Sequence, residues 1–310
     1  MSKIFSIIIT YNGEKWLPEC LRHLTESEVA TQIVIVDNAS TDNTIEIIKQ
    51  YGNAIHFIQN SKNAGFGQAN NIGMEYALNQ GADFIFLINQ DAYIFPGTIQ
   101  LLTAALTTHP DFGILSPLQL DSSGKEVEPI FKKFLLKNFS NEVITNMLHP
   151  VNNSDINKPY TMRFVNAAAW MMPRECVEKV GLFHPVFFHY GEDNHYASRV
   201  QFHKMKIGVL PAARIIHDSD TPIIDNHLLL LRQIRTVPLY TLLDLRKPLP
   251  VAFFLGFLKW KRLAKKIRKF SDTNDMSFIY EQKKWFNKKL SEAIAIRKET
   301  SKEWKKIKRP

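Results

Sequence analysis

Four short segments of this sequence combine residue types that can bind a ligand or transfer a proton. The first, Asn89-Gln90-Asp91, directly follows the apolar run Phe84–Ile88. A carboxylate at such a position is a hard oxygen ligand, suited to Mg²⁺ or Mn²⁺ held together with substrate phosphates. An isolated Asp after a strand is about as often a cap for the segment that follows. Its position alone therefore leaves both interpretations of Asp91 open.

The second segment places two adjacent carboxylates, Glu192 and Asp193, after an aromatic cluster at Phe183, Phe187 and Phe188. Apolar rings partly desolvate a carboxylate and raise its pKa, which can produce a general base of useful strength. Acidic residues also favour the first turn of a helix, because they complement the helix dipole. The two interpretations of this pair are compatible.

The third candidate is His217, which ends the apolar stretch 213–216 and precedes Asp218. Neutral imidazole is a common metal ligand. The chain has ten histidines, however, and any one of them is more often a surface or core residue than a ligand. His217 is therefore a weak candidate when it is considered alone.

The fourth segment, 63–67, has the sequence Asn-Ala-Gly-Phe-Gly and is followed by Asn70. Glycines let a backbone approach a ligand closely, and a helix beginning near Gln68 would direct its N-terminus at an anion. The spacing matches neither the Walker phosphate loop nor the dinucleotide fingerprint. This mismatch argues against a nucleoside triphosphatase and against a dehydrogenase.

Strands and helices alternate along the first third of the chain. β-Branched and apolar runs predict strands at 4–10, 32–37, 55–58 and 84–88. Helical spacing and turn signals predict helices at 16–24, 44–50, 68–79 and 96–107, the last with Pro96 as its first helical residue. This alternation predicts an α/β protein with a mainly parallel sheet covered on both faces. Ligands bind beyond the carboxyl ends of such strands, where 10–12, 37–38 and 89–91 converge.

The middle of the chain is less regular. We expect loop and a short helix over 118–160, a helix at 193–203, and two short strands at 207–210 and 213–217. Of the 310 residues, 45% are hydrophobic and only two are cysteines, which excludes a disordered chain and a disulfide scaffold. The apolar run at the N-terminus is too short for a signal peptide, so we expect a cytoplasmic protein.

The basic residues concentrate in a tail. Residues 241–310 contain 20 Lys+Arg against 7 Asp+Glu, whereas the whole chain has a net charge of +9. Within this tail, helical spacing puts Phe253, Phe257, Trp260, Leu263, Ala264, Ile267 and Phe270 on one side of a helix. That side either lies on the inner face of the cell membrane or packs on protein, including a second copy of the chain. We expect a catalytic domain at 1–220 and a helical, basic extension at 221–310.

Six motifs together resemble family 2 glycosyltransferases in order and spacing. They are TYN at 10–12, VDNASTD at 36–42, NAGFGQANNIG at 63–73, LINQDA at 87–92, FFHYGEDNHYASR at 187–199 and IIH at 215–217. The likeness is greatest to bacterial enzymes that build rhamnan, O-antigen and capsule chains. It implies a GT-A fold and an inverting transfer of a sugar from a UDP- or dTDP-sugar to a hydroxyl of a glycan or lipid-linked acceptor.

The resemblance also implies roles for individual residues. It assigns the metal, Mg²⁺ or Mn²⁺, to Asp91 and His217, and the catalytic base to Asp193 beside Glu192. It assigns the nucleotide sugar to Thr10, Tyr11, Asn12, Asp37, Asn63, Gly65, Asn70, Asn89 and Gln90. Asn89 stands where the family often has a second carboxylate, and His195 where it often has an aspartate. We expect His195 and Trp170 at the acceptor, although Trp170 is equally a candidate core residue.

Two other functions compete with this interpretation. A sugar nucleotidyltransferase would need a glycine-rich loop after the first strand, and the segment 10–15 is not such a loop. A non-catalytic carbohydrate- or nucleic-acid-binding protein could use the basic tail, but that tail lacks the interleaved aromatic residues of a single-strand binder. The presence of Asp91, Asp193 and His217 together favours an active glycosyltransferase that does not bind nucleic acid.

Overall fold

The computed structural model describes residues 2–150, 156–218 and 226–270, and then 277, 279–281, 283–284, 287–288 and 291–298. The chain forms two compact units. One comprises Met1–His189 with His203–Asp220, and the other comprises Tyr190–Phe202 with Thr221–Pro310. The boundary expected at 220/221 lies outside the described residues. The segment 190–202, which was expected in the first domain, is grouped with the C-terminal helices.

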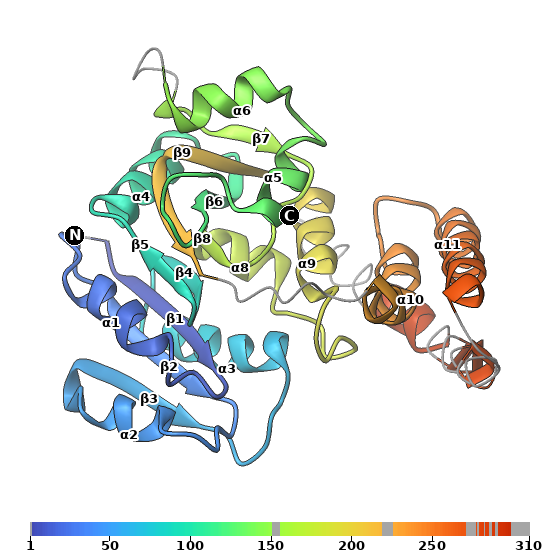
Figure 1. Ribbon diagram of the computed structural model, residues 1–310, viewed down its shortest axis with the longest axis horizontal. Coiled ribbons are helices and arrows are strands. Elements are labelled where there is room, and N and C mark those ends of the chain that lie inside the picture. Colours follow the sequence, from blue (N-terminus) through green and yellow to red (C-terminus); the bar gives the residue numbers. More distant parts are fainter. Residues whose placement is uncertain are drawn as a thin grey trace, which may run out of the picture. The chain divides into compact units, whose positions relative to one another are not determined.

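The first unit is built on a single mixed sheet (Figure 1). Its strand order is β3 (Ile55–Gln59), β2 (Gln32–Asp37), β1 (Ile4–Thr10), β4 (Phe84–Asn89), β8 (Ala169–Pro173), β6 (Phe112–Leu120), β9 (Lys206–His217) and β5 (Ala92–Ile94), with β7 (Tyr160–Met162) on β9. Strands β3, β2, β1 and β4 are mutually parallel, and β6 is parallel to β9, whereas β8 runs antiparallel between them. The predicted α/β class is confirmed.

The pairing register gathers the polar strand ends at one edge of the sheet. Thr10 pairs with Asp37, Ile9 pairs with Asn89, and Ala92 pairs with His217. The first two pairs end parallel strands, whose carboxyl ends point the same way. The third brings the segment after β4 beside the end of β9, which lies far away in the sequence.

Helices cover both faces of the sheet. Helices α1 (Leu17–Thr25), α2 (Thr44–Lys49) and α4 (Thr98–Thr108) share one core cluster with the sheet face that carries Ile8 and Ile35. Helix α3 (Phe66–Asn79) packs on the opposite face, so close to β1 that a Cβ on Gly73 would lie 2.5 Å from Cγ2 of Ile7. The remaining helices of the unit are η1 (Gly52–Ala54), α5 (Pro129–Leu135), α6 (Asn141–Leu148) and α8 (Arg174–Val180).

Three expectations about secondary structure were wrong. Pro96 does not begin α4, because Gly97 adopts a left-handed conformation with φ 75° and the helix starts at Thr98. The described part of the interval 118–160 contains the end of a buried strand, β6, and the helices α5 and α6. The two short strands near 210 form one strand, β9. A register shift against β6 between Pro117 and Leu118 accommodates Pro211, which has no N–H to donate.

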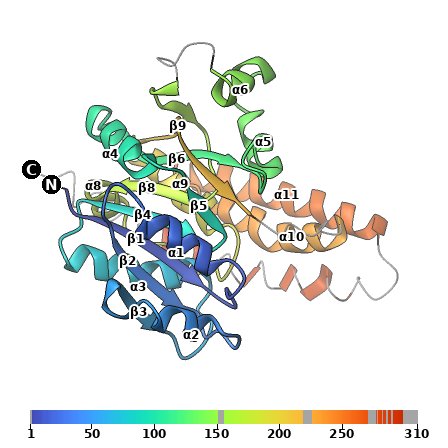
Figure 2. The same cartoon turned by 60° about the vertical axis from the view of Figure 1, so that its left-hand side comes forward.

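The second unit is helical, with α9 (Glu192–Phe202), α10 (Asn226–Leu242) and α11 (Leu249–Phe270). Helices α10 and α11 lie side by side (Figure 2). A Cβ on Gly256 would lie only 3.0 Å from the carbonyl oxygen of Pro238. No helix among the described residues is both long and apolar enough to cross a membrane.

The apolar stripe expected on the tail helix packs mostly on protein. Trp260, Leu263, Ala264 and Ile267 are buried in a cluster with residues of α10 and with Ile279. Phe257 is partly buried against the same cluster, Phe253 is 40% exposed, and the side chain of Phe270 lies outside the described residues. The packing interpretation therefore holds for the central part of the stripe.

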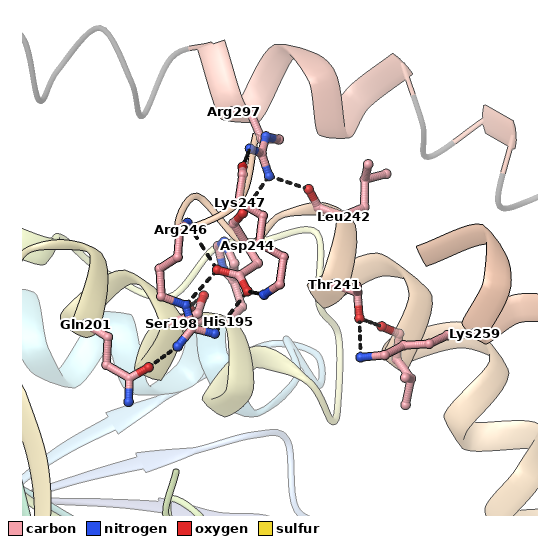
Figure 3. Close-up of polar contacts among 11 residues, drawn as sticks. His195, Ser198, Gln201, Thr241, Leu242, Asp244, Arg246, Lys247, Lys259 and Arg297 are labelled. Atoms are coloured by element: carbon pink, nitrogen blue, oxygen red, sulfur yellow. Dashed lines mark hydrogen bonds and ion pairs between the residues drawn. The ribbon is translucent and has the colours of Figure 1, made fainter. Parts of the chain in front are cut away.

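A buried carboxylate organises the turn between α10 and α11 (Figure 3). Both oxygens of Asp244 accept hydrogen bonds from Arg246, at 2.7 and 2.9 Å, and Oδ2 also pairs with Lys247. Arg297 is buried and donates to the backbone carbonyls of Leu242 and Asp244, both at 2.7 Å. Arg246 also donates to Gln201 of α9. The turn thus links α9, the two long helices and the segment 291–298.

We predict that Asp244→Asn destabilises the fold at neutral pH and that the loss shrinks in acid. Burial tends to raise the pKa of Asp244, but the bonds from Arg246 and Lys247 outweigh it and lower the pKa to about 2. The stabilisation is therefore present above about pH 4 and disappears as pH falls toward 2. Because the partners are partly exposed, we expect ~1–2 kcal/mol at pH 7 by denaturant unfolding.

Asp111→Asn is the matched control, because Asp111 forms an ion pair with Lys206 in which both side chains are about half exposed, 48% and 51%. Its effect should stay below ~0.5 kcal/mol. An Asp244→Asn effect that is equally small at pH 7, or that does not change with pH, would contradict the role assigned to Asp244.

Candidate active site

A cleft of about 370 Å³ opens at the polar edge of the sheet in the first unit. Its volume falls within the range of small-molecule sites. It is lined by Ile9, Tyr11, Asn38, Asn63, Gly65, Phe66, Asn89, Gln90, Asp91, Phe188 and His189. Of the residues expected at the nucleotide sugar and the metal, the structure brings six together here, namely Tyr11, Asn63, Gly65, Asn89, Gln90 and Asp91.

Gln90 holds the loop that follows β1. Its Oε1 accepts a hydrogen bond from the hydroxyl of Thr10 at 2.7 Å and another from the backbone N–H of Tyr11 at 3.1 Å. Thr10 itself is buried and does not line the cleft, whereas the Tyr11 side chain is 48% exposed. These bonds present the Tyr11 ring at the cleft as a free aromatic face.

Asp37 and Asn12 support the cleft from behind. Asp37 is fully buried, and its carboxylate accepts bonds from the backbone N–H groups of Ala39 and Ser40 and from the Ser40 hydroxyl. Asn12, at φ 49°, accepts a bond from the N–H of Thr41 at 2.8 Å. Neither residue lines the cleft, so both shape the turns after β1 and β2.

Asn38 is a cleft residue that sequence reasoning did not select. Its Oδ1 accepts bonds from the side chain of Asn60 at 3.0 Å and from the N–H of Ala64 at 3.2 Å, and its Nδ2 donates to the carbonyl of Gly65 at 3.3 Å. It therefore fixes the loop between β3 and α3. The available signal was its position directly after Asp37 at the end of a buried strand.

The glycine segment approaches a second stretch of backbone. Gly65 has φ 83° and ψ 166°, and the N–H of Phe66 donates to the carbonyl of Phe188 at 3.2 Å. A Cβ on Gly65 would lie 2.0 Å from that carbonyl oxygen. Phe188 and His189 also line the cleft, although the sequence analysis did not assign them to the nucleotide sugar. Asn70 instead donates to the carbonyl of Phe66 within α3 and does not line the cleft.

Asp91, which lines the cleft, forms a pair with His217, which does not line it. Nε2 of His217 lies 3.6 Å from Oδ1 of Asp91, which is too long for a hydrogen bond. Oδ1 of Asp91 and Nδ1 of His217 are buried and have no hydrogen-bond partner in the part of the chain that the structure describes. Burial would lower the pKa of His217, but Asp91 outweighs it and the pKa is raised.

This pair fits a divalent ion. A carboxylate oxygen and an imidazole nitrogen are both ordinary ligands of Mn²⁺-like ions, and buried polar atoms without partners are rare unless something satisfies them. Within the described residues no group of three His, Cys, Asp or Glu side chains gathers around a point. The protein would therefore supply only part of the coordination sphere, and substrate or water would supply the rest.

The two expected catalytic carboxylates begin α9 in the second unit, after Tyr190 and Gly191, which have φ of 66° and 91°. Burial, followed by the charge of Asp193, raises the pKa of Glu192 to about 8. Burial also raises the pKa of Asp193, but Asn194 donates two hydrogen bonds to its Oδ1, at 2.6 and 2.9 Å. Oε2 of Glu192 has no partner among the described residues, and its raised pKa favours the protonated form of this carboxyl at neutral pH.

The two expected acceptor residues are both buried. Trp170 is fully buried in β8 and its ring stacks on Phe183 with centroids 6.3 Å apart, which favours the core interpretation of this tryptophan. His195 is 3% exposed, and its backbone N–H donates to the carbonyl of Gly191 in the first turn of α9.

Comparison with known proteins shows the family to which the chain belongs. Residues 6–181, more than half of the chain, match the family model described as Glycosyl transferase family 2. The chain belongs to this family. The dTDP-rhamnosyl transferase RfbF of Shigella flexneri is 24% identical over 221 residues, which are 70% of this chain and 69% of RfbF.

Other relatives share shorter segments or the fold alone. The poly(ribitol-phosphate) β-N-acetylglucosaminyltransferase TarS of Staphylococcus aureus is 28% identical over 115 residues, which are 35% of this chain and only 20% of TarS. The structure of TarS 1–349 in complex with UDP matches with a TM-score of 0.52 at 19% identity, covering 92% of this chain and 78% of that chain. The mannosyltransferase PcManGT of Pyrobaculum calidifontis, in complex with GDP-Man and Mn²⁺, matches with a TM-score of 0.57 at 13% identity, covering 95% and 85%. These structures confirm the GT-A fold.

We predict that Gly65→Ala weakens UDP binding by this family 2 enzyme about tenfold or more. The added Cβ would displace the loop from the Phe188 carbonyl, and the backbone conformation of Gly65 is essentially restricted to glycine. Isothermal titration with UDP in the presence of Mn²⁺ measures the loss.

The matched control is Gly81→Ala. Gly81 has almost the same φ, 81°, but a Cβ there meets nothing within 4 Å. The Gly81→Ala variant should be ~1 kcal/mol less stable, because alanine is strained at a positive φ, and it should keep its UDP affinity. Equal UDP affinities for the two variants would show that the Gly65–Phe188 contact does not shape the cleft.

Proposed function

We propose that this protein is an inverting glycosyltransferase of cell-surface polysaccharide synthesis. It transfers a hexosyl or deoxyhexosyl group from a UDP- or dTDP-sugar to a hydroxyl of a glycan or lipid-linked acceptor at the cytoplasmic side of the membrane. The observation that carries this proposal is the Asp91–His217 pair, of which Oδ1 and Nδ1 are buried with no hydrogen-bond partner among the described residues, and of which Asp91 lines a cleft on the carboxyl edge of a family 2 sheet.

The donor nucleotide would occupy the cleft in the first unit. The half-exposed ring of Tyr11 offers a stacking face for a pyrimidine, and the amide groups of Asn38 and Asn63 lie on the cleft wall. The names of two similar proteins support this donor class, since RfbF is described as a dTDP-rhamnosyl transferase and TarS has been solved with UDP.

Asp91 and His217 would hold Mg²⁺ or Mn²⁺. When bound, such an ion neutralises negative charge on the leaving diphosphate. This neutralisation lowers the barrier to departure of the diphosphate from the sugar. Asn89, which replaces a carboxylate often found in the family, leaves the site with one negative charge fewer. We therefore expect a modest metal affinity that rises when the nucleotide is present.

Asp193 would be the catalytic base. A sugar hydroxyl is a poor nucleophile, and a positioned carboxylate that takes its proton accelerates attack by ~10²–10⁴-fold. The hydrogen bonds from Asn194 favour the charged form of Asp193. A single displacement assisted by one base inverts the anomeric configuration.

A donor-hydrolysis screen tests the reaction class without a known acceptor. Purified protein with Mn²⁺ or Mg²⁺ should slowly release UDP or dTDP from at least one nucleotide sugar. NMR of the product of the active donor should show inversion at the anomeric carbon. Retention of configuration, or formation of nucleoside triphosphate from a nucleotide sugar and diphosphate, would contradict the proposal.

We predict that Asp91→Asn and His217→Gln each weaken Mn²⁺-dependent UDP binding by about tenfold or more, a loss of ~1.4 kcal/mol. Chelator treatment should have the same effect on the wild-type protein. Asp83→Asn is the control, because Asp83 lies at the opposite end of β4 and accepts a hydrogen bond from the backbone of Lys3. Binding of UDP that is unaffected by chelator would exclude the metal site.

We predict that Asp193→Asn lowers kcat by ~10²–10⁴-fold while the dissociation constant of UDP stays within a few-fold of the wild-type value. The amide keeps the shape of the side chain but cannot accept the proton. Steady-state rates with the donor found in the screen measure this loss.

Glu192→Gln is the matched control on the neighbouring residue. Because Glu192 is protonated at neutral pH, its replacement by a neutral amide should change kcat by less than ~10-fold at pH 7. A larger loss for Glu192→Gln than for Asp193→Asn would reverse the assignment of the base.

A further inference from the structure

The C-terminal unit contains a second hollow that the sugar-transfer reaction does not use. It has a volume of about 640 Å³ and lies between α11 and the described residues near 280. Four cationic side chains line it, namely Lys261, Lys265, Arg268 and Lys283, together with Trp260 and Tyr280. We call this hollow the basic groove.

The chemistry of the basic groove is that of an anion site. Within the described residues, the carboxylate of Asp244 forms its ion pairs with Arg246 and Lys247, which do not line the groove. Trp260 is 8% exposed, and its indole N–H is buried without a hydrogen-bond partner in the described part of the chain. A buried donor of this kind costs free energy unless an acceptor reaches it. A phosphate group in the groove would be attracted by these cationic side chains, and its oxygens could accept a hydrogen bond from a donor such as the indole N–H.

The same face of α11 continues from the basic groove into an exposed apolar strip. Val251, Phe254 and Leu258 are 47%, 59% and 40% exposed and occupy positions i, i+3 and i+7. Lys261, Lys265 and Arg268 follow Leu258 at steps of three, four and three residues, so they lie on the same side of the helix. One side of the helix is thus apolar in its first half and basic in its second half.

We propose that this face of α11 binds the surface of an anionic membrane, with a phospholipid phosphate in the basic groove and the apolar strip at the boundary of the acyl chains. A free phosphate would use the groove but not the strip, whereas a phospholipid uses both. An amphipathic helix with aromatic residues beside lysines has the composition of an interfacial helix. This inference concerns lipid binding alone and holds or fails independently of the sugar-transfer chemistry.

The test compares two triple variants of the full chain by co-sedimentation with vesicles. The groove variant carries Lys261→Gln, Lys265→Gln and Arg268→Gln. The control variant carries Arg262→Gln, Lys266→Gln and Lys269→Gln, which are exposed residues of the same helix that do not line the groove. Both variants lose the same charge from the same turns, so only the position of the charges differs.

We expect the groove variant to bind phosphatidylglycerol–phosphatidylcholine vesicles ~100-fold more weakly than the wild-type protein, since each basic residue at an anionic surface contributes ~1 kcal/mol. The control variant should lose less than ~10-fold, and Phe254→Ser should also weaken binding. Thermal unfolding of each variant verifies that α10 and α11 remain packed. Equal losses of vesicle affinity for the two triple variants would mean that binding depends on total charge and not on the groove, which would overturn the proposal. Wild-type protein that stays in the supernatant would also overturn it.

A second measurement separates a lipid headgroup from a free anion. Titration with inorganic phosphate and with glycerol phosphate should show only weak binding that does not displace the protein from vesicles. Trp260→Phe, which replaces the indole with a smaller aromatic ring and removes the N–H, should reduce vesicle binding a few-fold. If inorganic phosphate competes fully with vesicles at its own dissociation constant, the groove is a site for a soluble anion and the membrane assignment is wrong.

Discussion

The parallel pairing of β1 with both β2 and β4 is the constraint on which the donor cleft depends. It places Thr10 beside Asp37 and Ile9 beside Asn89, so that three polar strand ends meet at one edge of the sheet. The strands are buried on both faces, and a slip by one residue would exchange the side chains that pack on the two faces, such as Ile7 against Gly73 of α3 and Ile8 in the cluster with α1, α2 and α4. The hydrophobic core therefore determines the register, and the register determines which polar groups meet.

The polar groups at this edge divide into two kinds. Asp37, Asn12, Gln90 and Asn38 use most of their hydrogen-bonding capacity on neighbouring loops, which makes the cleft a preformed surface. Oδ1 of Asp91 and Nδ1 of His217 keep buried capacity that no group in the described chain uses. Unused polar capacity inside a protein is costly, and for this reason we propose that a ligand completes the site at these two residues.

The second unit follows another principle. Its helices are amphipathic. Their packing relies on a small apolar cluster around Trp260 and Ile267 and on the turn at Asp244. That turn reaches α9 through Gln201, and α9 begins with Glu192 and Asp193. The C-terminal helices are consequently part of the structure that supports the two carboxylates proposed for catalysis, in addition to carrying the basic residues.

The sequence by itself determined the alternation of strands and helices, the polar strand ends and the likeness to family 2 glycosyltransferases, because these depend on local periodicity and on residue order. It also indicated Asp91 and His217, but their meeting required β5 to pair with β9 across more than a hundred residues of chain. Only the tertiary structure showed that Asp37 faces its own turn, that Trp170 lies in the core and that Asn38 lines the cleft. It also decided which side of α11 is buried, since a helix with apolar residues on more than one side does not reveal its partner. Side-chain direction and packing partners depend on contacts between distant segments, and a linear pattern carries no information about those contacts.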